Sequence, residues 1–180
     1  MNAKKLVRNR KKLPLNLVCS SFHDSYTWYY HRKTQSHGDK PAVIERGSRF
    51  WKNGRLYHRD DDKPAIIRSS GELHWYKHGK RHRDNDKPAI IFNNKERWWY
   101  QNGKLSRDSD KPAIIRGDGT KEWWNNTQRH RDNDKPAVIK PDGTKEWWLF
   151  GQRHRDNDKP AIIKADGSQR WYIQGYSYNP

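Results

Sequence analysis

One charged motif, Arg-Asp-x-Asp-Lys, recurs along this chain and places two carboxylates beside two cations. The copies begin at Arg59, Arg83, Arg107, Arg131 and Arg155. Aspartates separated by one residue occur in calcium-binding loops, but such loops also need a third oxygen ligand, a glycine at position six and a glutamate at position twelve. Here lysine and proline follow at once. We therefore expect the aspartates to cap turns and to pair with the adjacent Arg and Lys.

A column of histidines is the second candidate for chemistry. His58, His82, His130 and His154 occupy one position of the repeat. Zinc needs several donors at ~2.0–2.1 Å from one centre. Repeats of two strands each stand ~9–10 Å apart, so one histidine per repeat cannot supply such a site. We expect hydrogen bonds in turns from these histidines, and we expect no metal ion and no cofactor.

The sequence contains no pattern typical of a catalytic site. Glu122 and Glu146 recur at one repeat position on expected strands, and Cys19 has only His23 as a distinctive neighbour. An active site needs several different groups that converge once, whereas these residues repeat. We therefore expect a protein that is not an enzyme and has no small-molecule substrate.

Basic and aromatic residues alternate on the expected strands. If Asp142 and Gly143 form a two-residue hairpin loop, Lys140 pairs with Lys145, and alternation puts a tryptophan stripe flanked by cations on one sheet face. This candidate cationic aromatic face consists of Arg116, Lys121, Trp123, Lys140, Lys145, Trp147, Lys164 and Trp171. Such a face can stack bases and neutralise phosphates. Equally, the lysine stems can cover the tryptophans and keep their charged ends in water.

The first twelve residues form a basic segment with no acidic residue. Its cations are Lys4, Lys5, Arg8, Arg10, Lys11 and Lys12. Such a segment is either a solvated terminus or an electrostatic arm for nucleic acid or a partner chain. We assign residues 1–16 to this tail and residues 17–180 to a repeat domain.

A period of about 24 residues organises the elements that carry these side chains. Prolines stand at positions 41, 64, 88, 112, 136 and 160, and self-similarity at this spacing is typical of repeat proteins. In one unit, residues 136–140 read as a strand, Asp142 and Gly143 as a turn, and residues 145–150 as the return strand.

Aromatic pairs keep the same period, and a degenerate first hairpin fits residues 17–29, with His23 and Asp24 in its turn. We thus expect an all-β, elongated ribbon of about seven stacked antiparallel β-hairpins, with atypical terminal copies.

The units resemble MORN repeats. Trp51-Lys-Asn-Gly54 and Trp148-Leu-Phe-Gly151 carry the Trp-x-x-Gly pattern. The fuller unit, Asp-Gly-x-x-x-Trp-Trp-x-x-Gly-x-x-His-Arg-Asp-x-Asp-x-Pro-Ala, is similar to the MORN-like repeats of giant DNA viruses and some phages, over about residues 17–175. It departs from ordinary MORN repeats because Asp-Asn-Asp-Lys-Pro replaces a glycine-rich stretch and the hairpin is shorter. The resemblance implies an elongated ribbon with a non-catalytic role in scaffolding or in membrane and protein attachment.

Composition limits the partners and the compartment. The 180 residues have a net charge of +17, which favours nucleic acid, anionic lipid headgroups or an acidic protein surface. The single cysteine, Cys19, allows no intrachain disulfide, so we expect an intracellular, reducing compartment. The apolar run at residues 13–18 is shorter than a signal peptide needs, and no run reaches the ~18 apolar residues of a membrane span.

These features predict a structural, scaffold or adaptor protein that acts through protein–protein contacts. The resemblance to viral repeats further implies a minor structural component of a virion. Two alternatives stay open. The chain can bind or condense nucleic acid through its tail and its cationic aromatic face, or it can attach to anionic membrane surfaces.

Overall fold

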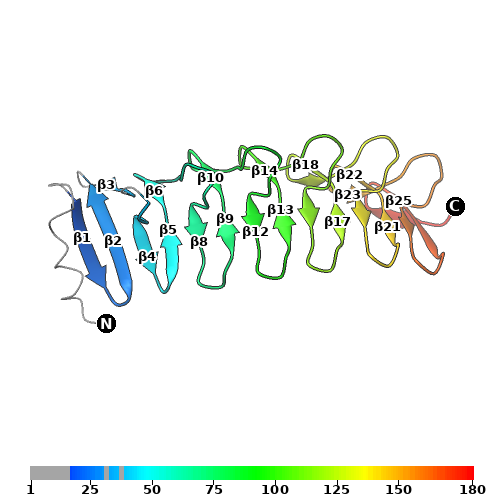
Figure 1. The fold of residues 1–180 in the computed structure, drawn as a ribbon. Coiled ribbons are helices and arrows are strands. Elements are labelled where there is room, and N and C mark those ends of the chain that lie inside the picture. Colours follow the sequence, from blue (N-terminus) through cyan, green and yellow to red (C-terminus); the bar gives the residue numbers. More distant parts are fainter. Residues whose placement is uncertain (1–16, 31–32, 37–38) are drawn as a thin grey trace.

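The computed structural model describes residues 17–30, 33–36 and 39–180, and these form one long antiparallel β-sheet (Figure 1). The strands stand side by side in chain order along an elongated molecule, from β1 at one end to β25 and β26 at the other. The predicted all-β ribbon of hairpins with a period of about 24 residues is confirmed. The predicted tail at residues 1–16 lies outside the described residues. The described part of the chain has no helix with the length and apolar character needed to cross a membrane.

Seven hairpins in the described residues build this sheet. Their strands are β1 (Leu17–Phe22), β2 (Ser25–Tyr30), β4 (Val43–Glu45), β5 (Ser48–Phe50), β8 (Ile66–Ile67), β9 (Leu73–His74), β12 (Ile90–Ile91), β13 (Arg97–Trp98), β16 (Ile114–Ile115), β17 (Lys121–Glu122), β20 (Val138–Ile139), β21 (Lys145–Glu146), β24 (Ile162–Ile163) and β25 (Gln169–Ile173). Two further strands complete it, β3 (Lys33–Thr34) beside β2 and β26 (Tyr176–Tyr178) beside β25.

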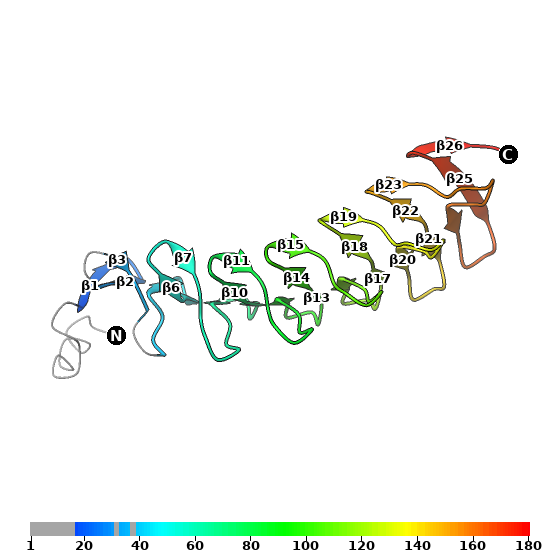
Figure 2. The same ribbon diagram turned by 90° about the horizontal axis from the view of Figure 1, so that it is seen from above.

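A second row of small hairpins runs alongside the long sheet (Figure 2). The pairs are β6 (Lys52–Asn53) with β7 (Leu56–Tyr57), β10 (Tyr76–Lys77) with β11 (Lys80–Arg81), β14 (Tyr100–Gln101) with β15 (Lys104–Leu105), β18 (Trp124–Asn125) with β19 (Gln128–Arg129), and β22 (Trp148–Leu149) with β23 (Gln152–Arg153). Each pair follows the return strand of one repeat and forms a two-stranded sheet of its own.

The single return strand predicted for residues 145–150 is wrong, because Trp147 separates β21 from β22. The Trp147 N–H donates to Ala161 O of the next repeat at 2.8 Å, whereas its carbonyl accepts the His154 N–H of the small hairpin at 3.2 Å. Trp147 therefore bonds with the long sheet through its N–H and with the small hairpin through its carbonyl, and the chain leaves the long sheet at this residue.

Alanine joins successive repeats through its backbone. Ala113 donates its N–H to Glu122 O within its hairpin at 2.9 Å, and its carbonyl accepts the Trp99 N–H of the preceding repeat at 2.8 Å. The alanines at this position are all fully buried: Ala42, Ala65, Ala89, Ala113, Ala137 and Ala161. The proline before each one has no N–H to donate, which suits the residue that precedes a strand.

The hairpin turn at Asp142 has three residues and not the predicted two. Lys140 donates its N–H to Thr144 O at 2.9 Å, and Gly143 donates its N–H to Lys140 O at 3.0 Å. Gly143 is left-handed, with φ of 91°, and the Asp142 carboxylate accepts the Thr144 N–H at 2.8 Å. An Asp-Gly pair suits this loop as well as the two-residue loop, because a left-handed glycine ends the common three-residue hairpin loop.

The extra loop residue shifts the strand register by one. Val138 pairs with Glu146, and Ile139 pairs with Lys145. The predicted pairing of Lys140 with Lys145 is therefore wrong. Because a shift of one residue moves each side chain relative to its cross-strand partners, the faces of the sheet also differ from the prediction.

The first two hairpins do have two-residue turns. The predicted turn at His23 and Asp24 is confirmed, and both residues are left-handed, with φ of 32° and 49°. Arg46 and Gly47 form the second such turn. This shorter turn explains why the first proline step is 23 residues while the later steps are 24.

One face of the long sheet is buried. Its ladder alternates an aliphatic residue from each first strand, such as Ile90 or Ile114, with a variable residue from each return strand, such as Trp98 or Glu122. Tyr100 and Leu105 of a small hairpin belong to the same core cluster as Ile90 and Ile114. The core is therefore thin and continues from repeat to repeat.

Thr127 is poorly suited to its turn and provides a test of the small hairpins. It has φ of 73°, where the equivalent residues are Gly79, Gly103 and Gly151. A β-branched residue is strained in this conformation. We expect Thr127→Gly to raise the free energy of unfolding by about 0.5–1 kcal/mol, since relief of strain exceeds the added entropy of the unfolded chain.

The reverse substitution, Gly103→Thr, is the matched control. A Cβ at Gly103 meets only ordinary contacts, with Lys80 Cβ at 3.7 Å, so the backbone conformation decides the result. It should lower stability by about 1–2 kcal/mol in urea unfolding. A Thr127→Gly variant no more stable than the wild type would contradict the assigned turn.

Candidate functional site

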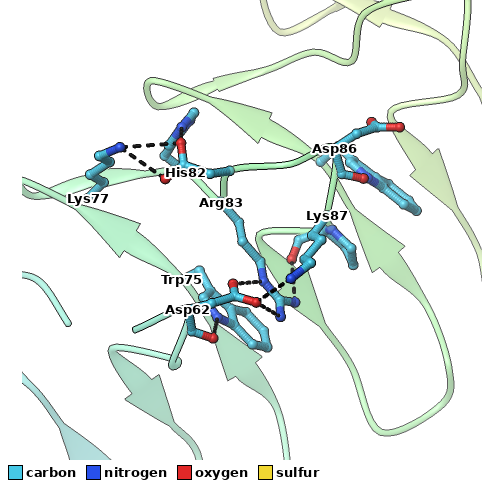
Figure 3. A network of polar contacts seen from close by, with 10 residues as sticks. Asp62, Trp75, Lys77, His82, Arg83, Asp86 and Lys87 are labelled. Atoms are coloured by element: carbon cyan, nitrogen blue, oxygen red, sulfur yellow. Dashed lines mark hydrogen bonds and ion pairs between the residues drawn. The ribbon is translucent and has the colours of Figure 1, made fainter. Parts of the chain in front are cut away.

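A cluster of ions and one indole joins each repeat to the next (Figure 3). Arg83 donates from Nε and Nη2 to the Asp62 carboxylate at 2.6 and 3.1 Å, and Lys87 Nζ donates to it at 2.6 Å. The Arg83 guanidinium lies 3.8 Å from the centre of the Trp75 ring. Trp75 Nε1 in turn donates to the main-chain oxygen of Asp62 at 2.9 Å. We call these four residues the inter-repeat clamp.

A tight turn positions the clamp aspartate. Asp61 and Asp62 are both left-handed, with φ of 58° and 53°, and Lys63 donates its N–H to Asp60 O at 3.2 Å. Aspartate and asparagine adopt this conformation more readily than most residues. The first aspartate of the motif therefore closes the turn, and the last one provides the carboxylate.

The clamp recurs at fixed separations, with tryptophan 13, arginine 21 and lysine 25 residues after the aspartate. The other copies are Asp86, Trp99, Arg107 and Lys111; Asp110, Trp123, Arg131 and Lys135; Asp134, Trp147, Arg155 and Lys159; and, with separations one residue shorter, Asp39, Trp51, Arg59 and Lys63. The predicted pairing of clamp aspartates with cations of the same motif is therefore wrong. Each one binds the cations of the next repeat.

The clamp cations keep these carboxyls ionised. Hydrogen bonds from arginine, together with those from lysine, lower the pKa from 3.8 to about 2 in Asp62, Asp86, Asp110 and Asp134, against a smaller opposing effect of burial. The arginine side chains are only 14% exposed, whereas the Asp110 side chain is 43% exposed. The clamp is thus a half-exposed ion pair above a buried indole.

The histidines form hydrogen bonds in turns, as predicted. In three repeats, Nδ1 accepts a backbone N–H from the turn of the next small hairpin: His58 from His78, His82 from Asn102 and His154 from Gln174, at 3.3, 3.2 and 3.2 Å. His130 differs, because its Nδ1 has no partner among the described residues. Its ring stacks on Phe150 at 4.3 Å, as the His58 ring stacks on His78 at 4.8 Å.

Within residues 17–30, 33–36 and 39–180, no three His, Cys, Asp or Glu side chains are arranged to hold a metal ion. Independence from metals and cofactors stays a prediction.

Two buried carboxylates, Glu122 and Glu146, have partners that the sequence pattern did not predict. Glu122 is 3% exposed and bonds with Arg116 at 2.6 Å and with Arg129 at 3.0 Å. Glu146 is 6% exposed and lies 3.0 Å from Lys140. Burial alone would raise the pKa of Glu146, but the Lys140 hydrogen bond and nearby positive charges outweigh it and lower the pKa. Their burial follows from the strand register, which sequence reasoning placed one residue off.

The structure divides the predicted cationic aromatic face. Arg116 and Lys140 bind carboxylates on the buried face, whereas Lys121 and Lys145 pair across strands with isoleucines on the opposite face. Trp123 and Trp147 are only 8% and 7% exposed, under Arg131 and Arg155. Lys164 is exposed and Trp171 is half-buried. The predicted continuous Trp stripe with flanking cations is therefore wrong.

The second face of the long sheet carries a regular row of side chains instead. We call it the exposed row, and its members are Ile44, Arg49, Ile67, Leu73, Ile91, Arg97, Ile115, Lys121, Ile139, Lys145, Ile163 and Gln169. The isoleucines are half-buried and the cations are exposed. Arg49, Arg97, Lys121 and Lys145 make no ion pair within the described part of the chain.

Two surfaces can thus carry a function, the column of clamps and the exposed row. Comparison with protein-family models, curated proteins and solved structures found no match.

Hollows of 290 and 270 Å³ lie between successive clamp loops, and Asp108 is among the residues that line both. Their arginines and lysines already bind clamp aspartates. The exposed row, by contrast, carries a regular series of cations that no carboxylate of the described residues binds.

Removal of one clamp carboxylate tests its contribution to stability. Asp110→Asn leaves Arg131, which is largely buried, without its anionic partner. We expect the free energy of unfolding to fall by about 1–2 kcal/mol, more than for a fully exposed ion pair. Asp132→Asn, in the next loop, is the matched control, because the Asp132 side chain is 76% exposed and its carboxylate bonds only with His130 among the described residues. Urea unfolding should give a change below about 0.5 kcal/mol for the control.

Acid should weaken the clamps in a defined pH range. In Asp62, Asp86, Asp110 and Asp134 the folded pKa of about 2 lies below the unfolded value of ~3.9, so each of these four aspartates stabilises the fold above pH ~4. This stability is lost as the pH falls from ~4 through about 2. Solvent screening limits the loss to about 0.5–1 kcal/mol for each of these four clamps. Asp110→Asn should therefore show a smaller acid-induced drop in stability than the wild type, and an equal drop would refute the role of this clamp.

Proposed function

We propose that this chain is a non-enzymatic scaffold or adaptor protein that docks protein partners on its exposed row. The observation that carries the proposal is the regular row of aliphatic and cationic side chains, in which Arg97, Lys121 and Lys145 have no ion-pair partner among the described residues. A surface that repeats one pattern along an elongated sheet suits extended contacts with another chain. It suits the single convergent geometry of catalysis poorly.

The chemistry of the clamps supports this choice. Their arginines, lysines and aspartates bind one another, so they give the sheet its form and leave few free groups for a substrate. The Arg155 guanidinium lies 3.8 Å from the centre of the Trp147 ring and occupies the surface on which a base would stack. Protein contacts on the row are therefore favoured over nucleic-acid stacking.

A more specific proposal, a role in a virion, is based on the sequence motifs and not on the geometry of the sheet. The Trp-x-x-Gly units and the motif at His154 resemble the MORN-like repeats of giant DNA viruses and some phages. We therefore propose a minor structural component of a virion, made in a reducing compartment of the host cell, as the single Cys19 favours.

Binding of nucleic acid or of anionic membranes is the second candidate. The unpaired cations of the exposed row favour it, together with the six cations among residues 1–12. Such binding would be electrostatic and blind to sequence.

Site-specific photo-crosslinking tests the scaffold proposal. A photoreactive residue replaces Lys121 on the exposed row or Lys104 on a small hairpin, in cells that naturally make the protein. We expect protein adducts at position 121 and few at position 104. The triple reversal Arg49→Glu, Arg97→Glu and Lys145→Glu should reduce them at least fivefold. The matched reversal of Arg55, Lys80 and Lys104, which are exposed on small hairpins, should leave them unchanged.

Salt dependence separates the second candidate from the first. Affinity for mixed single-stranded DNA should fall by ~10³–10⁵ between 50 and 200 mM salt if six to ten phosphates are contacted. Tight binding at 200 mM salt that a folded Trp147→Ala, Trp171→Ala variant loses would indicate stacking, and would favour nucleic acid over the scaffold.

A further inference from the structure

The last clamp of the described chain is incomplete. Asp158 occupies the clamp position, and its main-chain oxygen accepts Trp171 Nε1 at 3.0 Å. The residue 21 positions later is Asn179, where every other copy has arginine at the equivalent place. Among the described residues, the Asp158 carboxylate is bonded by the Tyr178 hydroxyl at 3.4 Å, and no cation lies over the Trp171 ring. Half of a clamp is therefore present without its cations.

The same end of the molecule has an unpaired sheet edge. In the preceding repeat, Lys145 and Glu146 pair with β20 on one side and with β24 on the other. Gln169 and Arg170 pair with β24 only, and no strand in the described part of the chain lies on their other side. A free edge presents backbone N–H and C=O groups that pair readily with another strand.

The opposite end of the sheet offers a strand of matching direction. β1 is the first strand of its hairpin, as β24 is the first strand of its own, and within the described ranges β2 is the strand that pairs with β1. Placed antiparallel to β25 of another copy, β1 would continue the alternation of the sheet. The two ends are therefore complementary in strand direction.

Charge points to the same pairing. Ser20 pairs with Thr27, the residue before Trp28. Ile162 pairs with Arg170, the residue before Trp171, so Ser20 and Ile162 occupy equivalent positions of the repeat. A clamp arginine precedes this position by seven residues, as Arg155 precedes Ile162. The residue seven positions before Ser20 is Leu13, and the cations Arg10, Lys11 and Lys12 directly precede Leu13 in the sequence. The tail thus carries cations close to the position that the half-clamp lacks.

We propose that Asp158, Trp171 and the free edge of β25 bind the N-terminal end of a second copy, so that copies join head to tail. The tail cations of that copy complete the clamp, and its β1 extends the long sheet. This inference rests on the proposed scaffold function and names one of its partners. Because the two joined surfaces differ, the contact does not close on itself and produces linear chains of copies.

Sedimentation of the 180-residue chain at rising concentration tests the proposal. We expect the average mass of the wild type to rise above the monomer mass of 21.7 kDa. Asp158→Asn should weaken association at least tenfold. Asn179→Arg should also weaken it at least tenfold, because it supplies the missing guanidinium within the chain, and this variant should melt at a higher temperature. Asp156→Asn removes the same charge two residues away, at a side chain that is 78% exposed, and should behave as the wild type.

A wild type that stays monomeric up to its solubility limit would overturn the proposal, as would association that Asp158→Asn and Asn179→Arg leave unchanged. Circular dichroism verifies that each variant is folded, and the rise in melting temperature of Asn179→Arg is a second readout that misfolding cannot produce. The photo-crosslinking at position 121 reports on the exposed row separately. A failure of head-to-tail assembly is thus distinguishable from a failure of the scaffold function.

Discussion

An aspartate shared by the arginine and lysine of the next repeat is the interaction on which the molecule depends. The carboxylate of Asp110 fixes the Arg131 guanidinium, and that guanidinium covers the Trp123 ring, whose N–H returns to the Asp110 main chain. Each group thus limits the freedom of the others. Because every clamp joins one repeat to its immediate neighbour, we expect stability to follow from repeat units and nearest-neighbour contacts, as in other linear repeat proteins.

This arrangement explains how a chain with 31% hydrophobic residues forms a core. Each of the four inner repeats buries one alanine, one aliphatic residue and one clamp tryptophan, as Ala113, Ile114 and Trp123 show. The arginine guanidinium covers the indole while its charge stays paired with the aspartate. Polar residues therefore do part of the covering that a second layer of apolar side chains does in most domains.

Much of the fold was predictable because it follows local rules. The proline period, the left-handed turn at His23 and Asp24, and the number of hairpins all depend on spacing and turn chemistry. The three-residue loop at Asp142 was not predictable, since an Asp-Gly pair fits two loop lengths that differ by one residue in register. That one residue placed Glu146 on the wrong face and hid its burial. The clamp partners were also missed, although the constant separations of 13, 21 and 25 residues were a signal in the sequence.

The variable position of the buried ladder has a consequence for folding. The repeats are so alike that a hairpin can pair with a neighbour one period too far along, and the clamps alone would accept that mistake. The return strands of several repeats, however, carry different side chains at this position: Phe50, His74, Trp98 and Glu122, although Glu146 of the next repeat is again a glutamate. Glu122 needs Arg116 and Arg129 beside it, whereas Trp98 needs the Glu96 carboxylate that its indole N–H reaches at 2.6 Å. In the repeats where this position varies, it distinguishes hairpins that are otherwise interchangeable, and so favours pairing with the correct neighbour.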